Sequence, residues 1–320
     1  MIYLLLFLIS FFLTYIIKNY AIKKSLLDIP NARSSHTTPT PHGGGIAIAL
    51  TWFAGILFLY YHHDIPKTLF DALLVGMLIS GVSYLDDLFT LKAKSRLAVQ
   101  AIVAVLGLYC LGGFSTLNLG LFTIDNPIVT NLFAFFLIIW FINLYNFLDG
   151  IDGYAGSEAL FLSLAAFLLF GGSHFLVLAV AVLGFLFWNW HRAKIFMGDV
   201  GSTLLGYNVA IFTIYYANQS SLNFWIWIIL FGAFWFDATL TLLRRFKNGE
   251  RLSIAHKKHA YQRLNQSGWS HSKVVLASIM INITSLLLVY FSPSIFIAFA
   301  LVMMMLYACI RWIDAQKPFQ

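Results

Sequence analysis

The sequence has little charge: Asp, Glu, Lys and Arg make up 10% of its 320 residues, whereas 60% are hydrophobic. A water-soluble domain carries roughly 25% charged residues and about 45 to 50% apolar ones. The shortage of charge therefore excludes an ordinary soluble domain and indicates that lipid surrounds most of the chain.

Cysteine is also scarce, because Cys110 and Cys309 are the only two in the sequence. Both fall in apolar segments, and neither has the spacing of a metal ligand, so neither a disulfide framework nor a zinc site is implied. The Gly-x-x-x-x-Gly-Lys pattern is missing as well, which excludes a P-loop nucleotide site.

What the sequence does have is a succession of apolar runs. Most have about 16 to 22 residues, close to the roughly 20 that a helix needs to cross a bilayer core. The eleven runs are 2–17, 45–62, 68–85, 97–113, 128–145, 157–171, 174–190, 202–218, 222–243, 273–291 and 294–313. The pair at 157–190 could instead be one bent helix. The first run starts at Met1 without preceding basic residues, so we interpret it as a retained helix rather than a cleaved signal.

The runs predict an all-α, polytopic membrane bundle of about 11 transmembrane helices, forming a single domain over 1–320. With the N-terminus outside and the C-terminus in the cytoplasm, nineteen of the 20 Lys and Arg fall on the inner side and only Lys67 lies outside. This bias is what the positive-inside rule requires. Membrane topology thus explains the net charge of +7 without a nucleic-acid partner. On the outer side, the alternating segment 114–127 predicts a small hairpin that turns near Gly120.

Adjacent carboxylates, Asp86 and Asp87, stand at the predicted inner end of the third run. Two neighbouring acids repel each other, and leaving both ionised near lipid is costly without a cation or donors nearby. A Mg²⁺ ion that bridges substrate phosphates would supply that compensation. The alternative is a solvated helix end, neutralised by the basic residues at 92, 94 and 96.

An amide and two carboxylates recur every three residues in the next inner connection, at Asn146, Asp149 and Asp152. A helical turn would place all three on one face. Gly150 and Gly153 allow tight turns and a close approach of the backbone to a ligand. The motif fits a ligand site and a hydrogen-bonded loop equally well.

Asp199 follows Gly198 just before a further helix. Backbone N–H groups at such a helix start suit a phosphate, and Ser202 or Thr203 could cap the helix. The competing interpretation is that Asp199 is merely part of the cap.

The inner connection 244–272 contains seven Lys or Arg and one Glu, together with His256, His259 and His271. Cations beside acidic motifs fit a substrate that bears a diphosphate, neutralised by a metal from one side and by cations from the other. His256 and His259 are spaced like one face of a helix. Topology signals and solvated side chains are the alternative.

The first inner connection, 18–44, leads into three glycines at 43–45 after two prolines. These glycines would leave backbone amides open to an anion beside His42, or would allow close helix packing. All five polar clusters fall on the inner side, whereas random placement would scatter them over both faces. We therefore expect them to form one site.

Together these motifs resemble those of the polyprenyl-phosphate N-acetylhexosamine-1-phosphate transferases. The resemblance covers about 33–264 and rests on an ordered set of elements: the Thr-Pro-Gly-Gly segment at 38–45, Asp86-Asp87, the segment 146–153, the segment 196–202 and the His-rich loop at 256–259. In this family the lipid phosphate attacks a UDP-sugar and releases UMP, the first membrane step in building O-antigen and related envelope polysaccharides.

The resemblance implies roles for individual residues. Asp86 and Asp87 would be the catalytic acids, and Asp199 and Asp149 would bind the metal. The substrate contacts would be His42, Asn146, Asp149, Asp152, Arg251, His256 and His259. Mg²⁺ would be the cofactor, with Mn²⁺ as an alternative, and UDP-N-acetylhexosamine and undecaprenyl phosphate would be the substrates. The chain would lie in the bacterial cytoplasmic (inner) membrane with its active site on the cytoplasmic face, and whether it forms a homodimer is left open.

Two departures from the family pattern qualify these roles. Thr90 stands where some relatives have a third acid, which argues against an Asp-rich motif that binds metal unaided. The segment His256-Lys257-Lys258-His259 is closer to the O-antigen and common-antigen enzymes than to the muramoyl-pentapeptide enzymes, which have consecutive histidines. It therefore favours an N-acetylhexosamine donor.

Two other functions remain open at this stage. A membrane aromatic prenyltransferase also grips a prenyl diphosphate with acidic helix ends and Mg²⁺. An ion-coupled transporter would use acids within the membrane, and Asp237 is the best residue for that role, although transporters place coupling residues near the bilayer midplane.

Overall fold

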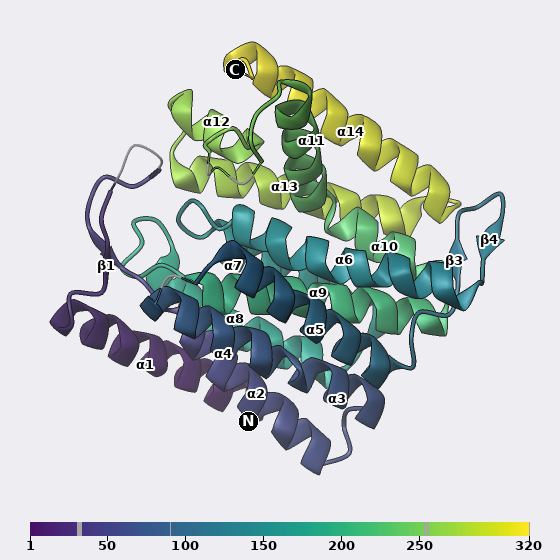
Figure 1. Ribbon diagram of the computed structural model, residues 1–320, viewed down its shortest axis with the longest axis horizontal. Helices are drawn as coiled ribbons and strands as arrows, with labels where there is room; N and C mark the ends of the chain where they lie inside the picture. Colours follow the sequence, from purple (N-terminus) through teal and green to yellow (C-terminus); the bar gives the residue numbers. More distant parts are fainter. Residues whose placement is uncertain (31–33, 90, 253, 255, 320) are drawn as a thin grey trace.

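The computed structural model of the chain describes residues 1–30, 34–89, 91–252, 254 and 256–319. Over these residues the chain is mostly helical, with two short hairpins (Figure 1). The elements are α1 (Ile2–Lys23), β1 (Leu27–Asp28), β2 (Thr40–Pro41), α2 (Gly45–Tyr61), α3 (Lys67–Leu74), α4 (Gly76–Phe89), α5 (Ala93–Leu111), β3 (Leu117–Asn118), β4 (Thr123–Ile124), α6 (Pro127–Phe147), α7 (Tyr154–Phe170), α8 (Ser173–Asn189), α9 (Asp199–Gln219), α10 (Asn223–Leu230), α11 (Gly232–Lys247), α12 (Ala260–Gln266), α13 (His271–Phe291) and α14 (Ile295–Gln316).

Each apolar run of the sequence coincides with one helix or with a pair of helices. The run 68–85 is divided between α3 and α4, and the run 222–243 is divided between α10 and α11, which bend by 72°. The run pair at 157–190 forms two helices, α7 and α8, which pack on each other, so the single bent helix is wrong. Gly171 and Gly172 make that turn with φ of 70° and 93°, values that favour glycine.

Six helices of the described chain are long and apolar enough to cross a membrane: α1, α3 with α4 as one span, α5, α6, α13 and α14. The bent pair α10 and α11 gives a seventh if it counts as one span. The helices α2, α7 and α8 are apolar but shorter. The prediction of an all-α, multi-pass membrane protein is therefore confirmed with six to seven candidate spans.

The centre of the bundle is α9, which Figure 1 shows between the helices of the two ends of the chain. Nearly every residue of α9 from Val200 to Ala217 is buried, and the helix packs against α2, α4, α6 and α10. Glycine allows the closest of these contacts, since a Cβ on Gly206 would lie 2.5 Å from the Phe141 carbonyl oxygen of α6. On another side, the Tyr207 hydroxyl donates to the Ala72 carbonyl of α3 at 2.6 Å. The buried body of α9 thus holds its first residue, Asp199, in a fixed position.

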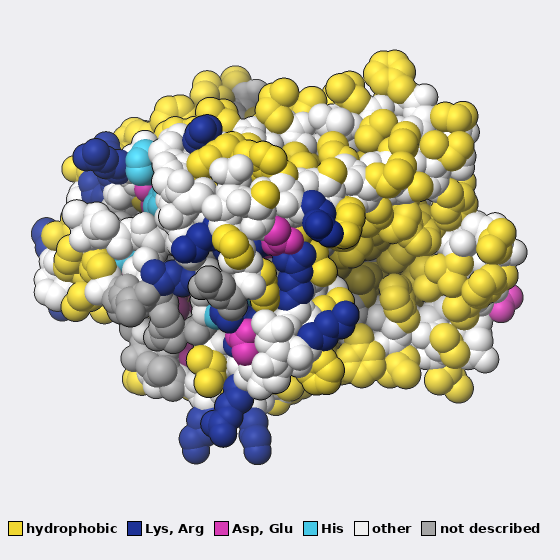
Figure 2. All heavy atoms as spheres, turned by 90° about the horizontal axis from the view of Figure 1, so that it is seen from above, with side chains coloured by type: hydrophobic (Ala, Val, Ile, Leu, Met, Phe, Trp, Pro, Cys, Tyr) yellow, Lys and Arg dark blue, Asp and Glu magenta, His cyan; other side chains and the backbone are white. Residues whose placement is uncertain are grey.

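The two ends of the bundle differ in polarity. The β3–β4 hairpin, which confirms the hairpin predicted for 114–127, lies at one end and pairs Leu117 with Ile124. The antiparallel β1–β2 pair lies at the opposite end, toward α12 (Figure 1). Figure 2 shows Lys and Arg side chains gathered over this second end, whereas hydrophobic side chains cover most of the remaining visible face. The polar connections are therefore concentrated at one end of an apolar bundle.

Candidate active site

A cavity of about 720 Å³ opens at the polar end of the bundle. Its walls come from five separate connections, within 27–42, 86–96, 146–152, 189–199 and 262–271. The described lining holds six Asp and a single Arg, with no Lys or Glu. The structure thus brings residues of all five polar connections to one place, with more acidic than basic side chains there.

Seven of the predicted site residues line this cavity: His42, Asp86, Asp87, Asn146, Asp149, Asp152 and Asp199. Arg251, His256 and His259 are absent from the described lining. Thr90, where the sequence departs from the family pattern, lies outside the described residues, as do 31–33. We refer below to Asp86, Asp87, Asp149 and Asp199 as the acid cluster.

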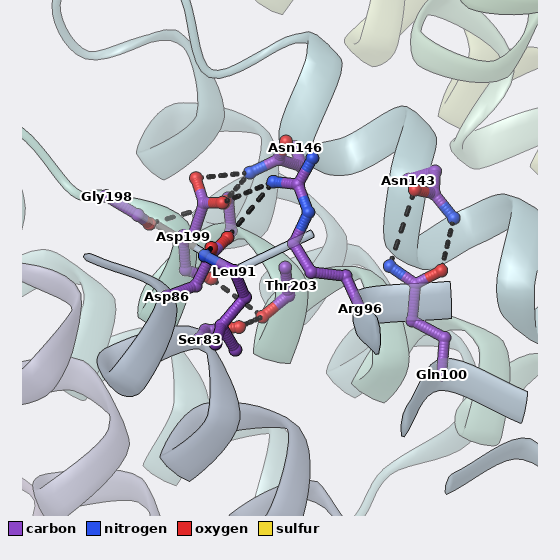
Figure 3. Close-up of polar contacts among 11 residues, drawn as sticks. Ser83, Asp86, Leu91, Arg96, Gln100, Asn143, Asn146, Gly198, Asp199 and Thr203 are labelled. Carbon is purple, nitrogen blue, oxygen red and sulfur yellow. Dashed lines mark hydrogen bonds and ion pairs between the residues drawn. The ribbon is translucent and has the colours of Figure 1, made fainter. Parts of the chain in front are cut away.

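Arg96 joins two members of the acid cluster (Figure 3). Its Nη1 lies 3.1 Å from Asp86 Oδ2 and 3.6 Å from Asp199 Oδ2. The second oxygen of Asp86 accepts the Leu91 backbone N–H at 2.6 Å, so the chain just beyond α4 folds back on the acid. Arg96 was considered at the sequence level only as a neutralising neighbour. Its position ten residues after Asp86, at the start of the next helix, was the available signal.

Asn146, in the last turn of α6, also contacts the acid cluster, and its side chain is neutral. Its side-chain amide donates to Asp199 Oδ1 at 2.8 Å and lies 3.0 Å from Ser202 Oγ (Figure 3). Asn146 therefore orients Asp199 through Oδ1, whereas Arg96 lies near Oδ2. A Lys or Arg in its place would neutralise Asp199, whereas the amide only orients it.

Asp199 is the first residue of α9, and its carboxylate does not cap that helix. The N-cap is Gly198, with φ of 75° and no side-chain cap bond. Ser202 and Thr203 bond back to the carbonyls of Gly198 and Asp199 at 3.2 and 2.7 Å, so the prediction that they cap α9 is wrong. Because its carboxylate does not cap α9 and lines the cavity, Asp199 is placed to contact a ligand there.

A close crossing of glycines holds the start of α9 in place. A Cβ on Gly45 would lie 2.3 Å from the Gly201 nitrogen, so α2 and α9 touch backbone to backbone. The N–H groups of Gly44 and Gly45 donate to the carbonyls of Phe196 and Met197 at 2.9 and 2.8 Å. Of the two interpretations of these glycines, close packing is therefore the one that Gly44 and Gly45 follow, since their amides are already bonded.

Asp87 and Asp149 complete the acid cluster. Asp87 Oδ2 would be 3.4 Å from a Cβ on Gly198, which places its carboxylate beside the start of α9. Burial and then the nearby Asp199 carboxylate raise the pKa of Asp149 from 3.8 to about 7. The predicted helical face of Asn146, Asp149 and Asp152 is wrong beyond Phe147, where α6 ends, yet the turn that follows still directs all three residues to the cavity.

Asp152 has different surroundings from the acid cluster. Its Oδ2 lies 2.8 Å from His191 Nδ1 and 3.2 Å from His271 Nδ1, and it accepts the Ala193 backbone N–H at 3.2 Å. Burial alone would raise the pKa of Asp152, but the hydrogen bonds from His271 and His191 outweigh it and hold the pKa below its ordinary value. Asp152 is therefore an ionised, well-partnered carboxylate.

Four of the seven basic side chains in the loop 244–272 form ion pairs outside the cavity lining. Asp314 of α14 accepts from Arg244 at 2.8 Å and from Arg263 at 2.6 Å. Glu250 pairs with Arg245 at 3.0 Å and with Lys258 at 2.8 Å. None of the seven Lys and Arg of the loop is among the described cavity-lining residues, and the loop contributes Gln262 and His271 instead.

His256 and His259 do not share a helical face, since both precede α12. Their rings are 4.8 Å apart, and His259 is buried with Nδ1 at 3.6 Å from Asp237 Oδ1. Burial, and then His259 and Arg245, lower the pKa of His256 from 6.5 to about 4, so it is neutral at pH 7.

Asp237 accepts the Ala260 backbone N–H at 2.8 and 2.9 Å, so it anchors α12. This anchoring role weighs against a transported-ion site at Asp237. We call Asp237, Glu250 and Asp314 the loop anchor.

A second cavity of about 300 Å³ adjoins the acid cluster and shares Asp86, Arg96, Asn146 and Asp199 with it. The rest of its wall is largely apolar, with residues such as Ile79, Val82 and Leu97 of α4 and α5. Two polar pairs interrupt this surface. Asn143 Nδ2 donates to Gln100 Oε1 at 2.7 Å, and the hydroxyls of Ser83 and Thr203 are hydrogen-bonded at 2.9 Å (Figure 3). The cluster therefore stands between the acid-lined cavity and a second cavity whose remaining wall is mostly apolar.

The donor set of the acid cluster fits Mg²⁺. Carboxylate and amide oxygens are the ligands that hard divalent cations prefer, and Mg²⁺ in such sites usually keeps several waters and binds substrate phosphates. The excess of acids over cations in the lining leaves charge for such an ion to neutralise. Asp86, Asp87, Asp149 and Asp199 line this cavity together with Asn146, so they are the residues that would supply oxygen ligands to such an ion.

The fold and the cavity define a class of protein: a multi-pass membrane protein with an acid-lined, oxygen-rich site at one end of its bundle. Comparison with known sequences places the chain more closely. Residues 69–217 match glycosyl transferase family 4. The "Probable undecaprenyl-phosphate N-acetylglucosaminyl 1-phosphate transferase" of Bacillus subtilis is 33% identical over 288 residues, covering 84% of this chain and 78% of that protein. The chain belongs to this family.

Two further relatives carry similar names. The "Undecaprenyl-phosphate alpha-N-acetylglucosaminyl 1-phosphate transferase" of Thermotoga maritima is 37% identical over 203 residues, covering 62% of this chain and 60% of that protein. The Salmonella typhi protein of the same name is 30% identical over 289 residues, covering 82% and 76%. The family resemblance inferred from the motifs is thereby confirmed.

Proposed function

We propose that the chain transfers an N-acetylhexosamine 1-phosphate, with N-acetylglucosamine favoured, from a UDP-sugar to undecaprenyl phosphate and releases UMP. The observation that carries this proposal is the cavity with six Asp and one Arg, contributed by five distant connections of a family 4 chain. A diphosphate bound with Mg²⁺ is a ligand whose chemistry matches such a surface. The names of the relatives support the sugar and the lipid.

The same proposal includes the arrangement in the membrane. Eleven crossings, made by α1, α2, α3 with α4, α5, α6, α7, α8, α9, α10 with α11, α13 and α14, would place the cavity and nearly all Lys and Arg on the cytoplasmic side. The N-terminus would then lie outside and the C-terminus in the cytoplasm of a bacterial inner membrane. Because a polyprenyl tail cannot leave the bilayer, the apolar second cavity beside α4 and α5 is the surface that would receive it.

In the reaction, an oxygen of the lipid phosphate forms a bond to the phosphorus that bears the sugar, and the bond from that phosphorus to the oxygen of UMP breaks. The lipid phosphate is mostly deprotonated near neutral pH, since its second pKa is about 6. Positioning and charge neutralisation therefore matter more than a general base. When bound, Mg²⁺ would supply charge neutralisation at the diphosphate.

The protein's own residues supply the positioning. Asp199, held by Asn146 at 2.8 Å, is oriented toward the cavity. Arg96 spans Asp86 and Asp199 and is the one cation of the described lining, so it is placed to bind an incoming phosphate. Asp87 faces Gly198 at the start of α9, where the backbone N–H groups of a helix start suit an anion.

The test is release of UMP by the purified chain in detergent, supplied with undecaprenyl phosphate, Mg²⁺ and UDP-N-acetylglucosamine. We expect UMP to appear only when the lipid, the nucleotide sugar and the metal are all present. A prenyltransferase or a transporter would release none. A panel of UDP-N-acetylhexosamines then identifies the sugar, and an O-antigen role requires that loss of the gene abolish that polysaccharide. A trapped phospho-aspartate during turnover would contradict the single-step reaction.

A further inference from the structure

A second cluster of ligand-type side chains adjoins the cavity, and two of its three members, Asp152 and His271, line the cavity wall. Asp152 comes from the α6–α7 connection, His191 from the α8–α9 connection and His271 from the first residue of α13. One carboxylate oxygen and one ring nitrogen from each histidine all lie within 4.8 Å of one another. Three chain segments that are far apart in sequence thus present one oxygen and two nitrogen donors to a single point.

The individual distances suit a shared ion. His191 Nδ1 is 2.8 Å and His271 Nδ1 is 3.2 Å from Asp152 Oδ2. Ligands bound at roughly 2.0–2.2 Å to one tetrahedral ion are themselves about 3.4 Å apart. Asp152 and His271 are buried, whereas the side chain of His191 is 33% exposed, which leaves a route from solvent.

His271 Nδ1 faces both a donor and an acceptor of Asp152. The backbone N–H of Asp152 donates to it at 3.3 Å when that nitrogen carries no proton, whereas a protonated Nδ1 donates to the carboxylate. The same nitrogen lies 3.2 Å from the Asp152 carboxylate oxygen, which has only lone pairs to offer. Two acceptors at this distance repel unless a cation stands between them, and the candidates are a proton on the imidazole and a metal ion.

The ligand types favour a metal different from the one expected at the acid cluster. Imidazole nitrogens suit zinc and its first-row neighbours, whereas Mg²⁺ prefers oxygen ligands. Two histidines with one carboxylate and an open position are a known zinc ligand set. We propose that Asp152, His191 and His271 bind one transition-metal ion of the Zn²⁺ class, which ties the three connections together at the cavity wall.

The proposal is tested on the full-length chain in detergent, with any affinity tag removed and bound metal stripped with EDTA. Co²⁺ serves as the probe, because a low-coordinate Co²⁺ ion with nitrogen ligands absorbs in the visible region. We expect one equivalent of Co²⁺ to bind, Zn²⁺ to displace it at micromolar concentration, and millimolar Mg²⁺ to leave it in place. The thermal midpoint should rise with Zn²⁺, since a ligand that binds only the folded state stabilises it.

Two variants make the test specific. His191→Ala, at a part-exposed position, should weaken Co²⁺ binding at least 10-fold and abolish the Zn²⁺ response of the thermal midpoint. His62→Ala, at an exposed histidine of the α2–α3 connection, should change neither. Stoichiometric Co²⁺ binding that survives His191→Ala would overturn the proposal. A wild-type chain that shows neither Co²⁺ absorption nor a Zn²⁺ response would also overturn it, and would assign the cation to a proton.

Discussion

Acidic side chains occupy two regions of this protein with opposite surroundings. In the loop anchor, each acid has several donors: Asp314 accepts from Arg244 and Arg263, and Glu250 from Arg245 and Lys258. In the acid cluster, four carboxylates share Arg96, the amide of Asn146 and the backbone N–H of Leu91 as the donors shown by the described residues. The first region is electrostatically complete, whereas the second is not.

The difference separates stability from function. A carboxylate with matched partners holds two segments together, so removing it leaves buried cations uncompensated. Carboxylates that repel one another raise the energy of the folded protein, and such an arrangement is typical of a site that awaits a cationic or metal-bound ligand. Substitutions in the acid cluster should therefore cost activity and spare the fold, and substitutions in the loop anchor should do the reverse.

The largest effect is expected for Asp199→Asn. It removes one charge from the acid cluster, and we expect UMP release to fall about 10³-fold, as when an electrostatic group of a preorganised site is lost. The thermal midpoint should stay unchanged or rise, because repulsion with Asp87 and Asp149 decreases. Asp71→Asn, which removes a charge at the opposite end of the bundle, is the matched control. A large drop in thermal midpoint for Asp199→Asn would assign Asp199 to the fold and break the comparison.

Arg96→Ala should have the next largest effect. Arg96 is the single cation of the described cavity lining, so its loss should reduce kcat/KM about 10- to 100-fold, in the range of a lost hydrogen bond to a charged group. Because Arg96 competes with a metal for Asp86 and Asp199, we expect half-saturation by Mg²⁺ to occur at a lower concentration in the variant. Arg96→Lys should recover part of the activity, and Lys94→Ala, an exposed neighbour, should behave like wild type. An unchanged Mg²⁺ requirement would contradict the competition.

How much of this was predictable from the sequence differs between the two regions. The apolar runs predicted the helices. The acids and the amide that follow those runs predicted Asp86, Asp87, Asn146 and Asp199 as site residues. Both patterns are local, so they can be read from neighbouring residues in the sequence. The sequence indicated Arg96 only as a neutralising residue and His271 only as part of a basic connection, and it did not assign either one to the site. Their roles depend on which connection meets which, and that is set by the packing of α9 against α4 and α6.

In the loop 244–272, the sequence indicated more contact with the site than the structure shows. Its seven basic residues looked like a floor for a diphosphate, yet two of them pair with Asp314, which lies 70 residues after Arg244. A sequence shows the charge of a segment, but not whether a distant acid already neutralises it. The break between α10 and α11 was missed for a similar reason, since an apolar run continues through a 72° bend without a change in composition.

Asp314→Ala should test the loop anchor directly. The Asp314 carboxylate accepts two hydrogen bonds from Arg244 and one from Arg263, whose side chain is 4% exposed. Removing one partner of a buried pair costs about 3–5 kcal/mol, and for this partly exposed acid we expect about 2 kcal/mol. The thermal midpoint should therefore fall by several degrees, while kcat at a permissive temperature stays within about twofold. Lost kcat with an unchanged thermal midpoint would place this acid in the catalytic apparatus instead.

The smallest effect, and the one with a defined pH dependence, is expected for Glu250→Gln. Hydrogen bonds from Lys258 and Arg245 lower the pKa of Glu250 from 4.5 to about 2. A carboxyl whose pKa is lower in the folded state contributes stability that is fully present above pH 4.5 and is lost as the pH falls toward 2. Because Glu250 and Lys258 are partly exposed to solvent and the Gln amide can still accept from Arg245, we expect a decrease in thermal midpoint of only about 1–2 °C at pH 7. The difference between wild type and variant should shrink from pH 5 to pH 3, and also in 1 M salt, where the screening length is about 3 Å.

Asp125→Asn, at an exposed acid with no ion pair among the described residues, should show no such trend. A difference that stays constant across this pH range would mean that Glu250 stabilises the loop through its shape rather than its charge.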